Sequence, residues 1–283
     1  MAAGAFAALT GLSVPVTGNA RSHYSWLTMS AKHQALRTAN LVASIVFRQK
    51  LPTYFHGQLI WLSKPCWSSM YSGYEPYMAD AIKAHLPRGG TFWDVGANIG
   101  LISLFASKIA GPGGHVLSFE PSPDVLALLR ENTEGEKNIK VLPYGIGNAD
   151  TLKSFAAQGT SSAASFVEDV TAINRRFLPD QPIEQVTVTM RKLDTLLDAA
   201  LSPAPSLVKI DIEGFELEAL KGADRLLSSI RPKLLIEIHP GQLTLCGGSE
   251  DKLFQRLRQH QYHWAIIDRN PNSLYSILAV PKP

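Results

Sequence analysis

Residues 91–100 have the sequence TFWDVGANIG, which joins a short apolar run to a turn that contains two glycines. The run at 91–95 predicts a buried β-strand, and the apolar stretch at 100–110 predicts a helix directly after the turn. Glycine-rich turns between a strand and a helix usually bind phosphate groups. Because Asp94 would repel a phosphate, the turn indicates a ligand of a different kind.

Strands and helices alternate from this turn to the end of the chain. Besides 91–95, strands are predicted at 115–120, 139–146, 206–212, 233–239, 263–268 and 273–280. Helices are predicted at 75–86, where Pro87 and the pair Gly89-Gly90 stop the helix, and at 100–110, 121–132, 216–230 and 250–260. The pattern predicts an α/β fold, a Rossmann-like, doubly wound and mostly parallel seven-stranded sheet. The last two strands form a hairpin, which places one antiparallel strand at the end of the sheet.

We expect residues 71–283 to form this domain and residues 1–70 to be an N-terminal extension. Residues 1–20 are small and apolar, with no basic residue before the apolar part, and are expected to form a flexible leader. Helices are expected within 23–50 and a short strand at 58–65. The extension could serve as a lid or as a surface for a homo-oligomer. Residues 147–190 interrupt the alternation and are expected to form an insertion near the rim of the site.

Composition excludes several classes of protein. The chain has 283 residues, 45% of them hydrophobic, and a net charge of +3 without a dense Lys/Arg run. This is enough for one sizeable core, while nucleic-acid binding and stable membrane insertion are not expected. The two cysteines, Cys66 and Cys246, are far apart and form no cluster with histidine. A reducing compartment, the cytoplasm, is therefore expected.

Polar side chains follow four of the predicted strands. In a doubly wound sheet, ligands bind beyond the carboxyl ends of the strands. The residues at these ends are Asp94, Glu120, Asp211, Glu213, Glu237 and His239.

The turn after the first strand predicts a cofactor. Gly96 can adopt a positive φ, and Gly100 lets the next helix approach closely. Asn98 replaces the middle glycine of the dinucleotide fingerprint, which argues against a pyrophosphate. Asp94 favours a cationic group, such as the α-amino group of S-adenosylmethionine. Glu120, expected at the wet rim of the site, can accept hydrogen bonds from both hydroxyls of a ribose.

Four segments together resemble a known family: FWDVGANIG, SFEPSP, VKIDIEGFELEALKGA and LLIEIHP. In order and spacing they are similar to the motifs of class I S-adenosylmethionine-dependent methyltransferases of the FkbM type, over about residues 71–280. The resemblance implies that Asp94, Gly96, Asn98, Gly100 and Glu120 line the cofactor site. It also implies O-methylation of a hydroxyl on a sugar, glycolipid or polyketide-type small molecule, without specifying the acceptor.

Methyl transfer to a hydroxyl requires in-line geometry and benefits from a base. The candidate catalytic residues are Asp211, Glu213 and His239, and His239 has the most suitable intrinsic pKa. His239 could instead simply cap the strand end. Asp211 and Glu213 are expected on one face and could bind a divalent metal. Further ligands cannot be located from the sequence, so no metal is expected.

Two other functions remain compatible with this topology. One is an NAD- or FAD-binding oxidoreductase, against which the missing glycine and the aspartate in the turn both argue. The other is a non-catalytic binding protein that retains the fold.

Overall fold

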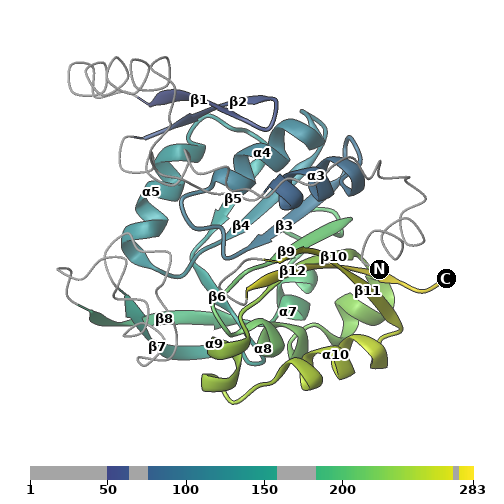
Figure 1. Cartoon of the computed structure of the whole chain (residues 1–283). Coiled ribbons are helices and arrows are strands. Elements are labelled where there is room, and N and C mark those ends of the chain that lie inside the picture. Colours follow the sequence, from purple (N-terminus) through teal and green to yellow (C-terminus); the bar gives the residue numbers. More distant parts are fainter. Residues whose placement is uncertain (1–49, 64–75, 158–182, 270–273) are drawn as a thin grey trace, which may run out of the picture.

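The computed structural model describes residues 50–63, 76–157, 183–269 and 274–283 (Figure 1). Its centre is a seven-stranded sheet. In spatial order the strands are β11 (Tyr262–Arg269), β12 (Tyr275–Pro281), β10 (Lys233–Ile238), β9 (Leu207–Ile210), β3 (Thr91–Val95), β4 (His115–Phe119) and β5 (Ile139–Leu142). Each neighbouring pair is parallel in the series β10, β9, β3, β4 and β5.

The mostly parallel α/β sheet predicted from the sequence is confirmed, with one difference in the hairpin. The strand β12 pairs antiparallel with both β10 and β11. The sequence predicted an antiparallel strand at the edge of the sheet. In the structure the antiparallel strand is β12, which lies one position inside the sheet, and β11 forms the edge. The turn that joins β11 to β12 lies largely outside the described residues.

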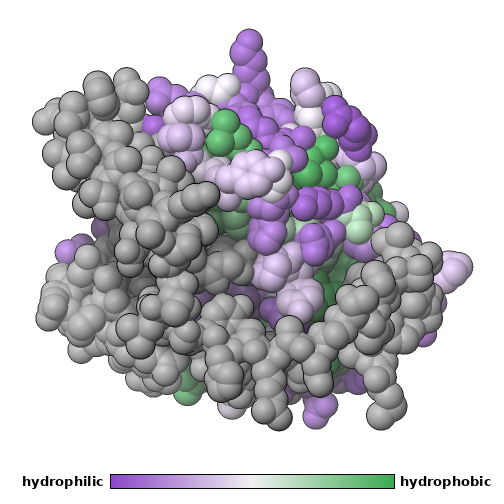
Figure 2. Space-filling view, turned by 45° about the horizontal axis from the view of Figure 1, so that its top comes forward, coloured by the Kyte–Doolittle hydropathy of each residue, from purple (hydrophilic) through white to green (hydrophobic). Residues whose placement is uncertain are grey.

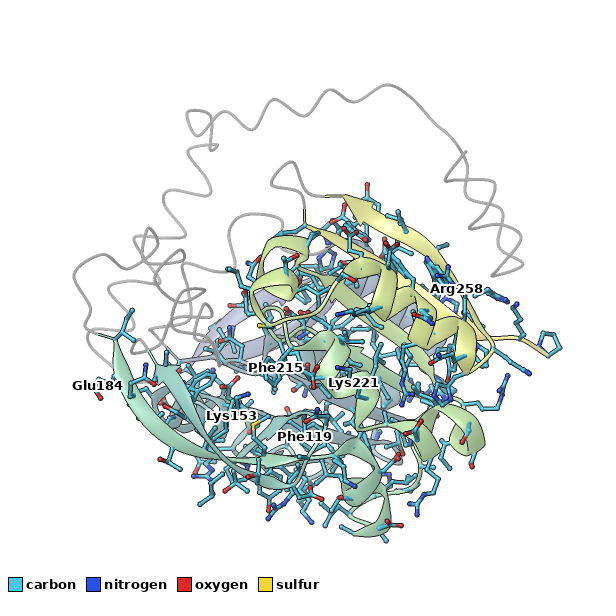
Figure 3. All side chains as sticks on the ribbon, turned by 90° about the horizontal axis from the view of Figure 1, so that it is seen from below. Phe119, Lys153, Glu184, Phe215, Lys221 and Arg258 are labelled. Atoms are coloured by element: carbon cyan, nitrogen blue, oxygen red, sulfur yellow. The ribbon has the colours of Figure 1, made fainter. Side chains whose placement is uncertain are left out.

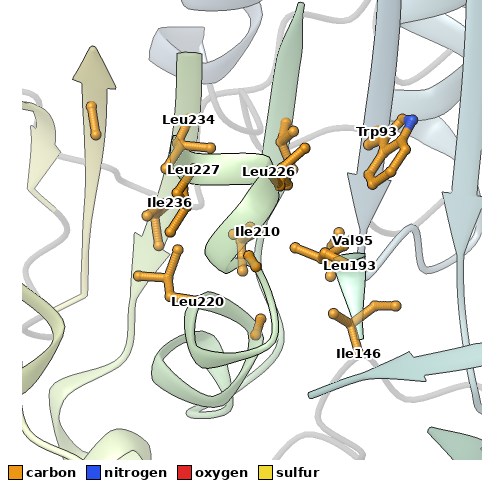
Figure 4. Close-up of a cluster of buried hydrophobic side chains, with 14 of the residues drawn as sticks. Trp93, Val95, Ile146, Leu193, Ile210, Leu220, Leu226, Leu227, Leu234 and Ile236 are labelled. Atoms are coloured by element: carbon orange, nitrogen blue, oxygen red, sulfur yellow. The ribbon is translucent and has the colours of Figure 1, made fainter. Parts of the chain in front are cut away.

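Helices cover both faces of the sheet, as the near-continuous apolar strands require. On one face lie α3 (Pro76–His85), α4 (Leu101–Ala110) and the hairpin of β1 (Leu51–Phe55) and β2 (Gln58–Leu62). The other face is covered by α7 (Leu193–Asp198), α8 (Glu216–Lys221), the π-helical turn η4 (Leu226–Ile230) and α10 (Glu250–Gln259). Figure 4 shows apolar side chains of this second face, from strands and helices that are distant in the sequence.

Two further helices begin at the carboxyl ends of strands. The helix α5 (Pro123–Thr133) follows β4, and α9 (Pro240–Leu245) follows β10. Each begins with a proline at its first position, where a missing N–H costs no hydrogen bond.

Trp93 and Phe119 are both 1% exposed and contact each other edge to face inside the core.

The predicted strand 139–146 is in fact two strands in two sheets. Only β5 belongs to the large sheet, whereas β6 (Tyr144–Ile146) pairs with β8 (Glu184–Arg191). Pro143 stands between them and has no N–H to donate to a sheet. The strands β6, β8 and β7 (Thr151–Ala157) form a separate three-stranded sheet (Figure 1). The expected insertion contributes β7 and nearly all of β8 to this sheet, and its serine- and alanine-rich part lies outside the described residues.

The predicted helix 216–230 is also divided, because α8 ends at Lys221. A Cβ atom at Gly222 would lie 2.1 Å from the carbonyl oxygen of Gly147, so the chain approaches the small sheet closely here. A new helical turn then begins at Arg225. Its backbone N–H and that of Leu226 donate to the carboxylate of Asp194, each at 2.9 Å. Asp194 thus caps a helical turn other than its own helix.

The front of the chain is described only in part. The expected leader and the expected helices before residue 50 lie outside the described residues. The hairpin of β1 and β2 includes the strand expected at 58–65, and its Phe55, Ile60 and Leu62 pack into the same apolar cluster as α4. The lid and oligomer roles of residues 1–70 stay predictions.

Polar and apolar side chains are interspersed on the face seen in Figure 2, where purple predominates between smaller green areas. Within the described ranges, none of the helices has the length and apolar character needed to cross a bilayer.

Gly96 provides a test of how closely β3 and β9 approach. Its φ is +80°, and an added Cβ would lie 1.9 Å from the carbonyl oxygen of Asp211. Gly96→Ala should therefore lower the free energy of unfolding in urea by at least about 2 kcal/mol. Gly113 has no atom within 4 Å of an added Cβ. Gly113→Ala is the matched control and should unfold like the wild type; equal stability of both variants would contradict the close approach.

Candidate functional site

Strand register explains why distant polar residues meet at the carboxyl edge of the sheet. Asp94 of β3 lies directly opposite Lys209 of β9. In the next strand pair, Ile210 lies opposite Ile236. Asp211 and Glu237 each follow these isoleucines by one position, and their carboxyl groups are in hydrogen-bond contact.

Asp94 is fully buried and paired with a cation from the chain itself. Its Oδ1 lies 3.3 Å from Nζ of Lys209, and its Oδ2 accepts a hydrogen bond of 2.6 Å from Ser103 Oγ. Burial raises the pKa of Asp94, whereas Lys209 and Ser103 act to lower it. The Lys209 Nζ also donates to the Gly96 carbonyl oxygen at 3.0 Å and lies 3.2 Å from Asp211 Oδ2. Lys209 is 3% exposed, so this cation is largely withdrawn from water.

The glycine turn is held by backbone and side-chain hydrogen bonds. The N–H groups of Gly96 and Ala97 both donate to the Phe119 carbonyl oxygen. Asn98 has a φ of 49°, which is rare for a residue other than glycine, and its Oδ1 accepts from the Ile99 N–H at 2.6 Å. A Cβ at Gly100 would lie 2.6 Å from Leu129, so the helix that approaches this glycine closely is α5 and not the helix that begins there.

Glu120 is buried at the end of β4. It is 8% exposed, so the expectation of a wet rim is wrong for its carboxylate. Oε2 accepts from the Asn98 N–H at 3.1 Å, and Oε1 accepts from the Ser122 N–H at 2.9 Å. Burial raises the pKa of Glu120 to about 7, although both backbone N–H groups act to lower it. Glu120 therefore ties the turn after β3 to the turn after β4.

His239 lies within a group of carboxylates. Its Nδ1–H donates to Glu216 Oε1 at 2.9 Å, and both side chains are at most 2% exposed. The same Glu216 oxygen accepts from the Gly214 N–H at 3.0 Å. The ring does not cap the following helix α9. Burial would lower the pKa of His239, but the carboxylates of Glu216, Glu213 and Asp211 raise it well above 6.5.

Asp211 and Glu213 lie beside the other ring nitrogen of His239. The Nε2 atom is 3.8 Å from Asp211 Oδ1 and 3.6 Å from Glu213 Oε2. Burial opposes ionisation of Asp211, yet Lys209 and His239 lower its pKa. Burial raises the pKa of Glu213 to about 7. Glu213 has a φ of 51°, an uncommon backbone conformation of the kind that gathers at functional sites.

All eight residues predicted from the sequence lie at the carboxyl edge, in two groups. One group surrounds the turns after β3 and β4, and the other follows β9 and β10. Two partners were missed, Lys209 and Glu216. A lysine inside the apolar strand LVKI was a visible signal, because a buried lysine needs a carboxylate. Glu216 carried no comparable signal, since a glutamate in the first turn of a helix is common.

A surface cavity of about 280 Å³ lies next to the second group, between the small sheet and the ends of α8 and α9. Phe215 lines it together with Lys153, whose ammonium lies 4.5 Å from the centre of the Phe215 ring. Figure 3 shows these two side chains coming from the start of α8 and from β7. None of the eight predicted site residues lines this cavity.

The buried Glu120 makes stability depend on pH. Its folded-state pKa of about 7 is higher than the ordinary value of 4.5, so the folded protein binds this proton more tightly than the unfolded chain. The resulting stabilisation is complete below the ordinary value and is lost as pH rises through about 7.

The free energy of unfolding of the wild type should therefore fall between about pH 5 and about pH 8. In Glu120→Gln this fall should be smaller by on the order of 2 kcal/mol. Urea unfolding at both pH values measures the difference. An unchanged pH dependence in the variant would show that Glu120 is ionised throughout.

The chain is similar in sequence to known methyltransferases. The family model of the methyltransferase FkbM domain matches residues 94–264, more than half of the chain. The hexuronic acid methyltransferase AglP of Haloferax volcanii is 31% identical over 157 residues, which is 53% of this chain and 56% of AglP. The 31-O-demethyl-FK506 methyltransferase FkbM of Streptomyces tacrolimicus is 28% identical over 163 residues, 48% of this chain and 60% of that protein.

Among solved structures, the chain is similar to a methyltransferase FkbM from Methylobacillus flagellatus, with 20% identity and a TM-score of 0.43. The match covers 68% of this chain and 43% of that protein. The chain thus spans little more than half the length of the similar proteins from Haloferax and Streptomyces. The matched region begins at Asp94 and contains both groups of site residues. With that match over most of the α/β sheet, the chain belongs to the FkbM family of methyltransferase domains.

Proposed function

We propose that the protein transfers a methyl group from S-adenosylmethionine to a hydroxyl of a small molecule, a sugar, a glycolipid or a polyketide-type compound. The family membership supports the reaction class. The names of two similar proteins, a hexuronic acid methyltransferase and an O-demethyl-FK506 methyltransferase, support this range of acceptors. The observation that carries the proposal is the pairing of a buried carboxylate with the glycine turn at one end of the sheet.

Glu120 is the residue we assign to the ribose of the cofactor. Each of its oxygens accepts one backbone N–H, and a carboxylate oxygen has room for a second hydrogen bond. The two oxygens can therefore accept the two ribose hydroxyls without releasing the turn. The neighbouring Ser122 hydroxyl is buried and has no hydrogen-bond partner among the described residues, which fits a polar ligand at this position.

Asp94 would act on the cofactor through charge and through the turn. Its carboxylate oxygens face Ser103 and Lys209, and its side chain is fully buried. Lys209 also pairs with Asp211, so one ammonium group faces two carboxyl groups. This excess of negative character favours a cationic amino-acid tail near Gly96, as the sequence suggested. Gly96, Asn98 and Gly100 shape the turn around it.

The second group would bind the acceptor. When bound, S-adenosylmethionine supplies a methyl group on a sulfonium, which a hydroxyl oxygen attacks in line. Asp211 and Glu213 follow β9, which pairs with β3, and His239 follows β10 on the far side of β9. The two carboxylates offer hydrogen-bond acceptors for the acceptor hydroxyl. Partial burial of the two carboxylates strengthens their interactions, because less water competes for them. We propose that they orient this hydroxyl and remove its proton.

The cytoplasm stays the proposed location, on the basis of cysteine use. Within the described part of the chain, Cys246 is a free thiol. Burial raises its pKa to about 11, so it is protected from reaction as a thiolate. This fits a reducing compartment.

Thermal shift measurements test the reaction class. S-adenosylhomocysteine and S-adenosylmethionine should raise the melting temperature, while NADH and FAD should not. Methyl transfer from labelled S-adenosylmethionine to a panel of uronic acids, neutral sugars and hydroxylated macrolides should then label at least one acceptor. Stabilisation by NADH alone would contradict the proposal, and binding of the adenosyl ligands without any transfer would favour a non-catalytic binder.

Glu120→Ala tests the ribose assignment. Hydrogen bonds to a charged group contribute about 1.5–3 kcal/mol, so affinity for S-adenosylhomocysteine should fall by about tenfold or more. Isothermal titration calorimetry measures this. Glu131 on α5 is exposed, and Glu131→Ala is the matched control that should bind like the wild type. Equal affinity of the Glu120 and Glu131 variants would rule out the assignment.

His239→Ala tests whether the second group acts on the acceptor. Loss of a group that positions or deprotonates the acceptor should lower kcat by about a hundredfold to ten-thousandfold. Affinity for S-adenosylhomocysteine should stay within about threefold, because the ribose and tail contacts are made elsewhere. A fall in cofactor affinity with an unchanged kcat would instead place His239 in the cofactor site.

A further inference from the structure

Three side chains at the ends of β9 and β10 converge on one point. One ligand atom each from Asp211, Glu237 and His239 lies within 4.8 Å of the others. Three atoms with separations of at most 4.8 Å all lie within about 2.8 Å of one common point. Shifts of up to about 0.7 Å for each atom, which side-chain rotation can supply, would bring all three to metal–ligand bonds of about 2.1 Å.

The orientation of His239 is independent support for a cation. The ring is 2% exposed, and its Nε2 points toward Asp211 and Glu213 at 3.8 and 3.6 Å, both longer than a hydrogen bond. Its Nδ1 is held by Glu216, which is fully buried. Histidines that bind metals usually donate their other ring N–H to a carboxylate in this way. The arrangement therefore directs Nε2 toward the convergence point.

The charges around this point are unbalanced. Two basic side chains, Lys209 and His239, face five carboxyl groups, those of Asp94, Asp211, Glu213, Glu216 and Glu237. Asp211 and Glu237 are in hydrogen-bond contact with each other. Two carboxyl groups at this separation require a proton or a cation between them.

Lys209 and His239 approach different oxygens of Asp211. The Lys209 Nζ lies 3.2 Å from Oδ2, whereas the His239 Nε2 lies 3.8 Å from Oδ1. The oxygen that faces the histidine is thus not the one that pairs with the lysine. Glu213 also lies next to His239 but is not one of the three convergent ligands.

We infer that Asp211, Glu237 and His239 form a binding site for a divalent metal ion of the Mn²⁺ or Mg²⁺ class. Two carboxylates favour a hard ion, and the imidazole favours Mn²⁺ within that class. The sequence predicted no metal because it showed only the pair Asp211 and Glu213. Strand register supplies the missing ligands, since Glu237 lies beside Asp211 across the sheet and His239 follows two residues later.

The role of the ion in the reaction rests on the proposed function. Three protein ligands leave coordination positions open for the acceptor hydroxyl, and a bound cation makes that hydroxyl more acidic. The hydroxyl proton passes to Glu213. The oxygen then bonds to the methyl carbon, and the carbon–sulfur bond breaks with its electron pair on sulfur. The products are the methyl ether and S-adenosylhomocysteine.

The inference can be tested without an activity assay. The full chain is first treated with EDTA to remove bound metal, and Mn²⁺ binding is then measured. Electron paramagnetic resonance of free Mn²⁺ during titration should show one bound ion per chain. Glu237→Gln and His239→Ala should each weaken binding by at least tenfold, and Glu216→Gln by about 10–100-fold through the histidine. Glu131→Gln removes an exposed carboxylate on α5 and should bind Mn²⁺ like the wild type.

Glu237→Gln also separates a metal site from a structural role. Its amide can donate to Asp211 and relieves the contact between two acids, so in EDTA the variant should be at least as stable as the wild type. Mn²⁺ should raise the melting temperature of the wild type but not of this variant. Absence of bound Mn²⁺ in the wild type, or equal binding by Glu237→Gln and Glu131→Gln, would overturn the inference.

Binding of S-adenosylhomocysteine to the same samples distinguishes the two proposals. Mn²⁺ binding without S-adenosylhomocysteine binding would leave the metal site standing and contradict the methyltransferase function. S-adenosylhomocysteine binding without Mn²⁺ binding would support the methyltransferase function and overturn the metal site.

Discussion

A single ammonium group, that of Lys209, holds together the carboxyl edge of the sheet. It lies between Asp94 and Asp211 and also donates to the Gly96 carbonyl oxygen. Removing these charges from water costs several kcal/mol per ion, and removal of one partner would leave the others buried without compensation. The strand end at β3, the strand end at β9 and the glycine turn are therefore positioned by the same contact.

This constraint divides the site into two parts with a common boundary. On one side, Glu120 connects the turns after β3 and β4 through two backbone N–H groups. On the other side, Glu216 fixes the ring of His239 next to Asp211. Asp211 belongs to both parts, because one oxygen faces Lys209 and the other faces His239. A cofactor and an acceptor bound on either side would thus meet near the end of β9.

The sequence predicted the order of strands and helices well, because apolar runs and helical periodicity are local signals. It did not show where the chain changes sheet at Pro143 or breaks at Gly222, since both depend on contacts with a distant small sheet. The site residues were located because the carboxyl ends of parallel strands share one edge. Their partners were missed. Lys209 stood out as a lysine in an apolar strand, but its pairing with Asp94 follows from strand register, and Glu216 is recognisable only from its contact with His239.

A crystal structure of the protein with S-adenosylhomocysteine tests the central claim most directly, that the buried carboxylate after β4 and the glycine turn form a cofactor site. The account predicts both ribose hydroxyls within hydrogen-bond distance of Glu120. It also predicts the amino-acid tail at the turn near Gly96, with the sulfur facing the group that contains His239. A ligand bound in the cavity beside Phe215, or a ribose that makes no contact with Glu120, would contradict it.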